Sequence, residues 1–337
     1  MLATSAPAPR RHDSPPSLEV AIIICTRGRP LDLASTLASL ADVQVPSSWT
    51  VDLLIVENGT DEGARKLAGD FRHSRITARH VFEPQPGKSN ALNRALRETA
   101  AALLLFTDDD VRFPSDWIVR MCEPIVSGRA DAVAGGVVLA PHLLRPWMTR
   151  THRAWLASTA DYLSAAEPSE MCGANMAVSR CVFDRVGGYD VELGPGVTNG
   201  GEETLFSWQI REAGFRLVGA LDVPVVHHLR SDRLRYAHWT RTARLQGHTR
   251  AYLMHHWQHK EIGFPRLREY YLRTKLVLRR MVSRRRKPED EGIAPWEMSY
   301  LQDIAQCSRF VVERRRARNY TPRGLRKLTS QPIVATV

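Results

Sequence analysis

Residues 103–112, LLLFTDDDVR, place three aspartates directly after a short apolar run. Such a run is typical of a strand buried on both faces of a sheet, and ligands of open α/β sheets bind beyond the carboxyl ends of these strands. Side chains alternate along an extended segment, so Asp108 and Asp110 should point the same way and Asp109 the opposite way. Two carboxylates about 5 Å apart repel by roughly 3 kcal/mol at an effective dielectric near 20. A divalent cation would relieve that repulsion; a solvated acidic turn is the alternative interpretation.

Strands and helices are expected to alternate on both sides of this stretch. Before it, the patterns predict strands at 19–25, 51–56 and 76–82, separated by helices at 31–40, around 61–70 and at 91–102. After it, they predict a helix at 114–127 and strands at 130–139 and 223–226, whereas residues 141–169 show no clear pattern. This alternation predicts an α/β fold with a mostly parallel central sheet flanked by helices.

The loops of this sheet match neither common phosphate-binding motif. TRGRP at 26–30 lacks the G-x-G-x-x-G pattern, and PGKS at 86–89 has no glycine five residues before Gly87. Nucleotide phosphates would therefore be neutralised by a cation and by basic side chains such as Arg29 and Lys88.

Two further groups of polar residues are candidates for chemistry. Glu202 and Glu203 follow a glycine-rich loop at 194–201 and should lie at the N-terminus of a helix. They either stabilise the helix dipole, by about 0.3–1 kcal/mol, or present a general base. His227 and His228 follow the strand at 223–226, where imidazole can bind a metal or phosphate, or simply lie on the surface.

The excess positive charge lies entirely in the last 75 residues. Residues 263–337 hold 18 basic and 7 acidic side chains, whereas residues 1–262 hold 29 of each. A basic amphipathic string at 270–282, YYLRTKLVLRRMV, precedes a cluster of cations at 284–287. Each cation near an anionic membrane contributes about 1 kcal/mol, so membrane contact is predicted. A helix packed on the body with a solvated basic face is the alternative. Nucleic acid is not expected, because no reading motif or aromatic platform accompanies the charge.

The cysteines and the N-terminus bear on the compartment. The five cysteines are scattered and never spaced as C-x-x-C, which favours reduced thiols over a zinc site or a disulfide framework. No apolar run approaches 18 residues, and residues 1–17 read as a disordered lead-in without the apolar core of a signal peptide. We therefore expect a cytoplasmic protein that can attach to the cytosolic face of a membrane.

Taken in order, several segments resemble family 2 glycosyltransferases, which have the GT-A nucleotide-sugar fold. They are IIICTRGRP (22–30), DLLIVENGTDE (52–62), PGKSNALNRAL (86–96), LLLFTDDDV (103–111), CGANMAVSRCVFDRVGGYD (172–190), GGEETLFSWQIREAGF (200–215) and VVHH (225–228). The resemblance covers about residues 18–230. It implies a GT-A domain at 18–262, with a nucleotide-binding half (18–112) and an acceptor half (113–262), before a basic helical extension at 263–337.

The resemblance also implies a donor site for a nucleoside-diphosphate sugar. Thr26 and Glu57 would contact the nucleoside, and Lys88 would lie near the base or the phosphates. Asp108 would face the ribose and the sugar, and Asn175 would border the donor sugar. The remaining residues assigned to this site are Arg29 and Asp109.

The metal and catalytic residues are implied in the same way. Asp110, with Asp108 and either His227 or His228, would hold Mn²⁺ or Mg²⁺. Glu203, with Glu202 beside it, falls where the family has its catalytic base.

The implied reaction is that of an inverting glycosyltransferase of the hexosyltransferase type. It would move a sugar to a hydroxyl of a glycan or lipid-linked acceptor, in cell-surface polysaccharide or glycolipid assembly. The sequence departs from the family pattern at Glu57-Asn58, where two aspartates are usual, and at Glu202-Glu203, where Glu-Asp is usual. Two alternatives stay open. A metal-dependent nucleotidyltransferase also needs clustered aspartates and a nucleotide, but it would release pyrophosphate. The Glu202-Glu203 departure makes an inactive scaffold with a basic membrane-binding tail conceivable.

Overall fold

The computed structural model describes residues 17–59, 63–283 and 286–328. The predicted lead-in, apart from Ser17, and the cations Arg284 and Arg285 lie outside these ranges. The expected strands before the acidic triplet are present as β1 (Leu18–Thr26), β2 (Trp49–Glu57), β3 (Ile76–Phe82) and β4 (Leu103–Asp108). All pair in parallel, in the order β3-β2-β1-β4. The carboxyl ends of β1, β2 and β4 therefore meet at one edge, as the sequence predicted.

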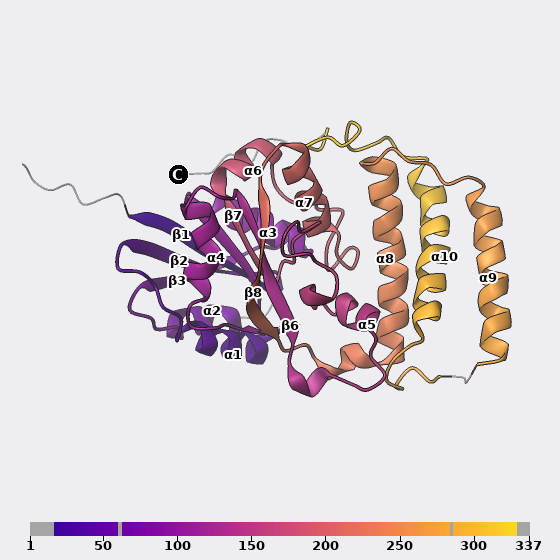
Figure 1. Ribbon diagram of the computed structural model, residues 1–337, viewed down its shortest axis with the longest axis horizontal. Helices are drawn as coiled ribbons and strands as arrows, with labels where there is room; N and C mark the ends of the chain where they lie inside the picture. Colours follow the sequence, from indigo (N-terminus) through magenta and orange to yellow (C-terminus); the bar gives the residue numbers. More distant parts are fainter. Residues whose placement is uncertain (1–16, 60–62, 284–285, 329–337) are drawn as a thin grey trace, which may run out of the picture.

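Alternate residues of these strands face two separate apolar layers. Ile22 and Ile24 face α1 (Pro30–Leu40), α2 (Gly63–Asp70) and α4 (Trp117–Val126). Ile23 and Phe106 face α3 (Lys88–Arg97), α6 (Arg180–Val186) and α7 (Glu202–Glu212). Helices therefore cover both faces of the sheet, which explains why β1 and β4 are apolar along almost their whole length (Figure 1).

The second half of the sheet is mixed rather than parallel. The short strand β7 (Asn175–Ser179) lies between β4 and β6 (Ala132–Leu139) and is antiparallel to both. Beyond β6 come β8 (Leu217–His227), which is parallel to β6, and the two-residue strand β5 (Val111–Arg112), which is antiparallel to β8. The sequence pattern did not predict β7, because its five residues, NMAVS, are too few to show a period.

The region at 141–169, which showed no clear pattern in the sequence, forms short helices. They are η1 (Pro141–Leu143), α5 (Arg150–Trp155) and η2 (Thr159–Asp161). Nε2 of His152, in α5, donates a 2.8 Å hydrogen bond to the carbonyl of Ile293, and its ring packs edge-on against Trp147 and Trp239. This region therefore joins the sheet domain to the C-terminal helices.

Three C-terminal helices form a layer of their own. Figure 1 shows α8 (Tyr236–His256), α10 (Pro295–Glu313) and α9 (Pro265–Met281) side by side, with α9 outermost. The helix α8 lies before the expected boundary at residue 262, yet it packs closely along α10. The layer therefore begins near residue 236, after the short helix η3 (Ser231–Leu234). Within the described part of the chain, no helix combines the length and the apolar character that crossing a bilayer requires.

Buried polar contacts hold this layer to the sheet domain. Asp190 accepts hydrogen bonds from the hydroxyls of Tyr252 (2.5 Å) and Tyr320 (2.8 Å). The fully buried pair His256 and Glu313 joins α8 to α10, with 2.9 Å between Nε2 and Oε2. Burial opposes the charge on Glu313, but His256 and Arg309 lower its pKa to about 2. The helical layer is thus fixed by specific ion pairs as well as by apolar packing.

Asn175 ties four elements of the mixed half together. Its Oδ1 accepts a 2.9 Å hydrogen bond from the indole of Trp117, and its Nδ2 donates to the carbonyls of Gly136 (2.8 Å) and Val223 (2.9 Å). Gly135 lies directly against this amide. A Cβ at Gly135 would lie 2.3 Å from Cγ of Asn175, closer than real Cβ contacts allow.

We therefore predict that Gly135→Ala lowers the free energy of unfolding by about 1–3 kcal/mol, because the side chain of Asn175 would be displaced from its partners. Gly69→Ala in α2 is the matched control: its new Cβ would meet nothing within 4 Å, and helix propensity favours alanine. Chemical denaturation of both variants checks the prediction. Equal stability of the two variants would show that the Asn175 contacts are not a structural constraint.

Candidate active site

The three aspartates at the end of β4 have different partners. Oδ1 of Asp108 accepts a 2.6 Å hydrogen bond from Nζ of Lys88, the first residue of α3. The buried carboxylate of Asp109 accepts hydrogen bonds of 2.6 Å from Thr26 and of 2.6 Å from Arg29. Asp110 lies between Arg29 and His227. The repulsion expected of the triplet is therefore offset by two cationic side chains, Arg29 and Lys88, from two other parts of the chain.

Arg29 bridges two of the carboxylates. Its Nη1 donates to Asp109 (2.6 Å) and its Nη2 to Asp110 (2.5 Å), while Nε donates to Asp32 (3.0 Å). Burial opposes the charge on the guanidinium, but Asp109 and Asp110 raise the pKa of Arg29 above its usual value. The planar fork of arginine suits this bidentate arrangement.

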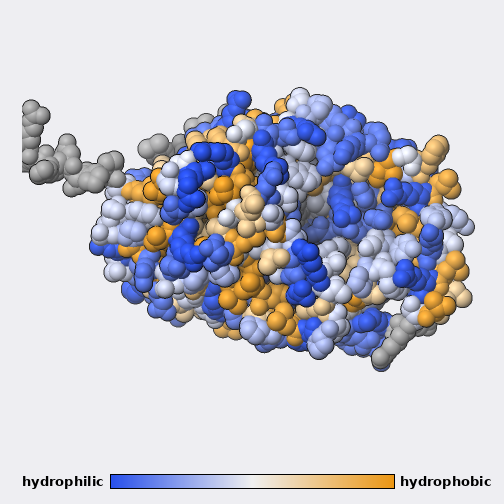
Figure 2. All heavy atoms as spheres, in the orientation of Figure 1, coloured by the Kyte–Doolittle hydropathy of each residue, from blue (hydrophilic) through white to orange (hydrophobic). Residues whose placement is uncertain are grey.

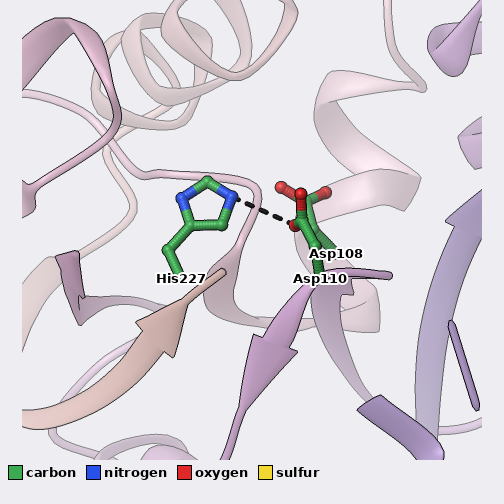
Figure 3. Close-up of side chains that lie close together, drawn as sticks. All are labelled: Asp108, Asp110 and His227. Carbon is green, nitrogen blue, oxygen red and sulfur yellow. Dashed lines mark ion pairs between the residues drawn. The ribbon is translucent and has the colours of Figure 1, made fainter. Parts of the chain in front are cut away.

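Asp108, Asp110 and His227 form a group, here called the cation cluster, that could hold a metal ion. One ligand atom from each lies within 4.8 Å of the other two, and Figure 3 shows the imidazole facing the carboxylates. Nε2 of His227 lies 3.1 Å from Oδ1 of Asp110. Although burial favours the neutral acid, His227 and Arg29 hold the pKa of Asp110 below its usual value.

Strand pairing explains why these distant residues meet. Val111 of β5 pairs with His227 of β8, and the amide of His228 donates to the carbonyl of Asp110 (2.7 Å). The ring of His228 lies beside that of His142, 5.5 Å between centroids, so His227 is the histidine that joins the cluster.

The donor set has the chemistry of a hard or borderline divalent cation. Carboxylate oxygens suit Mg²⁺ and Mn²⁺, and an imidazole is compatible with a first-row transition metal. Among the described residues, Oδ1 of Asp110 and Nδ1 of His227 are buried without a hydrogen-bond partner. The residues present therefore fit the Mn²⁺ or Mg²⁺ predicted from the sequence.

A cavity of about 240 Å³ opens beside this cluster. Seven residues that the sequence predicted for the donor or metal site line this cavity: Thr26, Arg29, Lys88, Asp108, Asp109, Asp110 and His227. The sequence reading did not assign the other lining residues, which are Cys25, Arg27, Asn58, Pro195, Gly196 and Arg233. Asn58 could have been suggested by its place next to Glu57, but nothing in the sequence places Arg233, on η3, at this cavity.

Two predicted donor-site residues do not line the cavity. The carboxylate of Glu57 is buried and lies 2.8 Å from Nε2 of His80. The side-chain amide of Asn175 is hydrogen-bonded to the three protein partners described above, so we leave Asn175 out of the proposed donor site. Asn58 lines the cavity instead and accepts a 2.8 Å hydrogen bond from the amide of Gly87, which positions the start of α3.

The two glutamates at the start of α7 have different environments. Glu202 is fully buried, and neither carboxylate oxygen has a hydrogen-bond partner among the described residues. Burial raises the pKa of Glu202 well above its usual value, and Glu203 adds to this. Glu203 is partly exposed, with Oε1 3.8 Å from Nζ of Lys88. Only Glu203 therefore presents a partly accessible carboxylate.

Lys88 is the contact between the cation cluster and α7. It reaches Asp108 at 2.6 Å and Glu203 at 3.8 Å, and burial of its ammonium is outweighed by these carboxylates, which hold its pKa well above the usual value. The loop at 193–201 closes over the start of α3, where the amide of Lys88 donates to the carbonyl of Pro195 (3.0 Å). Four glycines of this loop have positive φ: Gly194, Gly196, Gly200 and Gly201.

The sequence of the sheet domain decides the family. Residues 21–187 match the profile of Glycosyl transferase family 2. This segment is a family 2 glycosyltransferase domain. The resemblance seen in the sequence motifs is thereby confirmed for residues 21–187.

Curated proteins with related sequences include a polysaccharide biosynthesis protein and a glycosyltransferase. The chain is 33% identical over 122 residues to the succinoglycan biosynthesis protein ExoM of Rhizobium meliloti, covering 36% of this chain and 39% of that protein. It is 25% identical over 185 residues to the glucosyl-dolichyl phosphate glucuronosyltransferase of Haloferax volcanii, covering 52% of this chain and 58% of that protein. The chain thus matches less than two thirds of the length of either relative.

Solved structures confirm the GT-A fold. The mannosyltransferase PcManGT from Pyrobaculum calidifontis, in complex with GDP-Man and Mn²⁺, superposes with a TM-score of 0.56 at 18% identity, covering 87% of this chain and 86% of that one. GalNAc-T7 with UDP, GalNAc and Mn²⁺ gives a TM-score of 0.52 at 15% identity, covering 71% of this chain and 49% of that one. At these identities the likeness concerns the fold of the glycosyltransferase domain.

The geometry of the cluster predicts that Asp110→Ala weakens Mn²⁺ binding at least tenfold, because one of three ligands is lost and Arg29 and His227 are left facing the site without it. Asp70→Ala, which removes an exposed carboxylate at the end of α2, should leave Mn²⁺ binding unchanged. Isothermal titration with Mn²⁺ alone checks both variants. Unaltered affinity in the Asp110 variant would reject this cluster as the metal site.

Proposed function

We propose that this chain transfers a sugar, with inversion, from a nucleoside-diphosphate sugar to an acceptor hydroxyl. The observation that carries the proposal is the position of Lys88, which touches both Asp108 of the cation cluster and Glu203 of α7. The residues suited to the leaving diphosphate and the residue suited to deprotonate an acceptor are therefore adjacent to one another.

Positive side chains around the cavity suit the diphosphate of the donor. Lys88, Arg27 and Arg233 line it, and none of the ion pairs found among the described residues involves Arg27 or Arg233. A divalent cation at Asp108, Asp110 and His227 would neutralise the negative charge that develops on the departing nucleoside diphosphate. Arg29 is already occupied by Asp109 and Asp110, so we assign it to holding those carboxylates rather than to the donor.

Glu203 is the proposed general base. It lies in the first turn of α7, and the backbone of Gly173 leaves room for it, since a Cβ there would lie 2.3 Å from Oε1 of Glu203. Its carboxylate would take the proton of the acceptor hydroxyl as that oxygen attacks the anomeric carbon from the face opposite the leaving group. A single displacement of this kind inverts the anomeric centre.

We infer the acceptor and the pathway from sequence similarity and from the distribution of charge. Similarity to a succinoglycan biosynthesis protein favours polysaccharide or glycolipid assembly, with a glycan or lipid-linked acceptor. The basic charge of residues 263–337 favours attachment to an anionic membrane surface on its cytosolic side, where a lipid-linked acceptor would be presented.

We predict that Glu203→Gln lowers kcat for sugar transfer by about a hundredfold or more, because an amide cannot accept the acceptor proton. Donor binding should persist, since the cation cluster and Lys88 are intact. The control is Glu212→Gln at the other end of α7, which should keep full activity. Release of UDP, GDP or dTDP from the corresponding nucleoside-diphosphate sugars with Mn²⁺ is the assay. A fully active Glu203 variant would reject the base assignment. Release of pyrophosphate when the chain is given a nucleoside triphosphate and a sugar 1-phosphate would instead indicate a nucleotidyltransferase.

A second prediction concerns the phosphate contacts. Arg233→Ala should raise the KM for the donor roughly tenfold or more with a smaller change in kcat, because a charge-assisted hydrogen bond to phosphate contributes about 1.5–3 kcal/mol. Arg230→Ala is the matched control: it comes just before the same short helix and pairs with Asp232 at the surface. Equal KM values for the two variants would remove Arg233 from the donor site.

A further inference from the structure

Helix α9 has an apolar face that the described chain does not cover. Its inner face packs against the neighbouring helices through Leu272 and Leu276. The apolar residues of the outer face and its two ends are between 54% and 86% exposed. They are Phe264, Leu267, Tyr270, Tyr271, Val277, Leu278, Met281 and Val282. All of these except Phe264 and Val282 belong to the helix itself. At 3.6 residues per turn, those within the helix lie on the side opposite Leu276 and form one continuous surface, here called the α9 outer face.

This surface is bordered by positive charge. Helix α9 contains six basic side chains and one acidic one. Arg273 and Arg280 are paired with Glu269 and Glu297. Lys275 lies over the ring of Tyr271, 4.5 Å from its centroid, and thus directly at the edge of the apolar face. Figure 2 shows strongly hydrophilic and hydrophobic residues side by side at the end of the molecule that α9 forms.

From this arrangement we propose that the α9 outer face is a membrane-docking surface for an anionic lipid bilayer. The helix would lie in the plane of the interface, with Leu278 and Met281 in the boundary between headgroups and acyl chains. Tyrosine rings suit that boundary, and Lys and Arg can keep their charges on lipid phosphates while their stems cover apolar surface. This inference deepens the proposed membrane attachment by naming the surface that carries it.

Charge favours a bilayer over a second copy of the chain. In a two-fold symmetric dimer through α9, each basic border would face its own copy, and like charges across an interface oppose association. An anionic bilayer neutralises the same border. The position of α9 at the outer edge of the helical layer also leaves the surface free to approach a flat partner without the sheet domain in the way (Figure 1).

The test compares two matched valines in the full-length chain. Val277 in the α9 outer face is 58% exposed, and Val126 at the end of α4 is 53% exposed. Val277→Asp should weaken co-sedimentation with phosphatidylcholine vesicles that contain phosphatidylglycerol by roughly tenfold or more, because an inserted apolar side chain is replaced by a carboxylate. Val126→Asp should bind these vesicles as the unchanged chain does. Both substitutions replace exposed side chains, so thermal unfolding should be unaltered in both variants.

Two outcomes would overturn the proposal. One is equal vesicle binding by the Val277 and Val126 variants. The other is a dimer of the unchanged chain in sedimentation equilibrium that Val277→Asp converts to a monomer, without any vesicle binding by the unchanged chain. The assay uses no sugar donor, so its failure is distinguishable from failure of the transferase proposal.

Discussion

The structure depends on how the charge at the end of β4 is balanced. Three carboxylates lie at the tip of one buried strand, and no single neighbour could offset their mutual repulsion. Arg29, just before α1, and Lys88, at the start of α3, share this task, and His227 of β8 lies beside Asp110. Asp109 is turned inward and held by Thr26 and Arg29, whereas Asp108 and Asp110 keep oxygens directed at a common point with His227. The same arrangement that stabilises the strand tip therefore leaves a set of ligands suited to a divalent cation.

The rest of the fold positions groups around that point. The pairing of β5 with β8 brings His227 to Asp110, and the start of α3 brings Lys88 to Asp108. The first turn of α7 brings Glu203 to the other side of Lys88. Small residues make these approaches possible, since Gly173 leaves space for Glu203 and Gly135 for Asn175. The short helix η3, which carries Arg233, borders the cavity just before the helical layer begins, and that layer exposes the α9 outer face.

The sequence predicted the parts of this account that depend on local pattern. Apolar runs and their breaks placed β1 to β4. The alternation expected along 108–110 does not hold, because β4 ends at Asp108 and the turn that follows brings Asp109 and Asp110 to the same guanidinium of Arg29. The short strand β7 was missed because five residues are too few to show a period, and its antiparallel pairing depends on contacts between residues far apart in the chain. The choice between His227 and His228 needed the register of β5 on β8. Arg233 could not be assigned to the cavity, since its position depends on the path of a short helix after β8. Glu57 illustrates the same limit, because its burial against His80 follows from the pairing of β2 with β3.

The central claim is that Asp108, Asp110 and His227 together hold a cation that carries a nucleoside diphosphate. Pulsed electron paramagnetic resonance of Mn²⁺ bound to the full-length chain with UDP, GDP, dTDP or CDP tests it directly. The account predicts that, with at least one nucleotide, the same spectrum shows magnetic coupling of Mn²⁺ to phosphate phosphorus and to one imidazole nitrogen. Binding of Mn²⁺ that shows neither coupling with any of these nucleotides would contradict it.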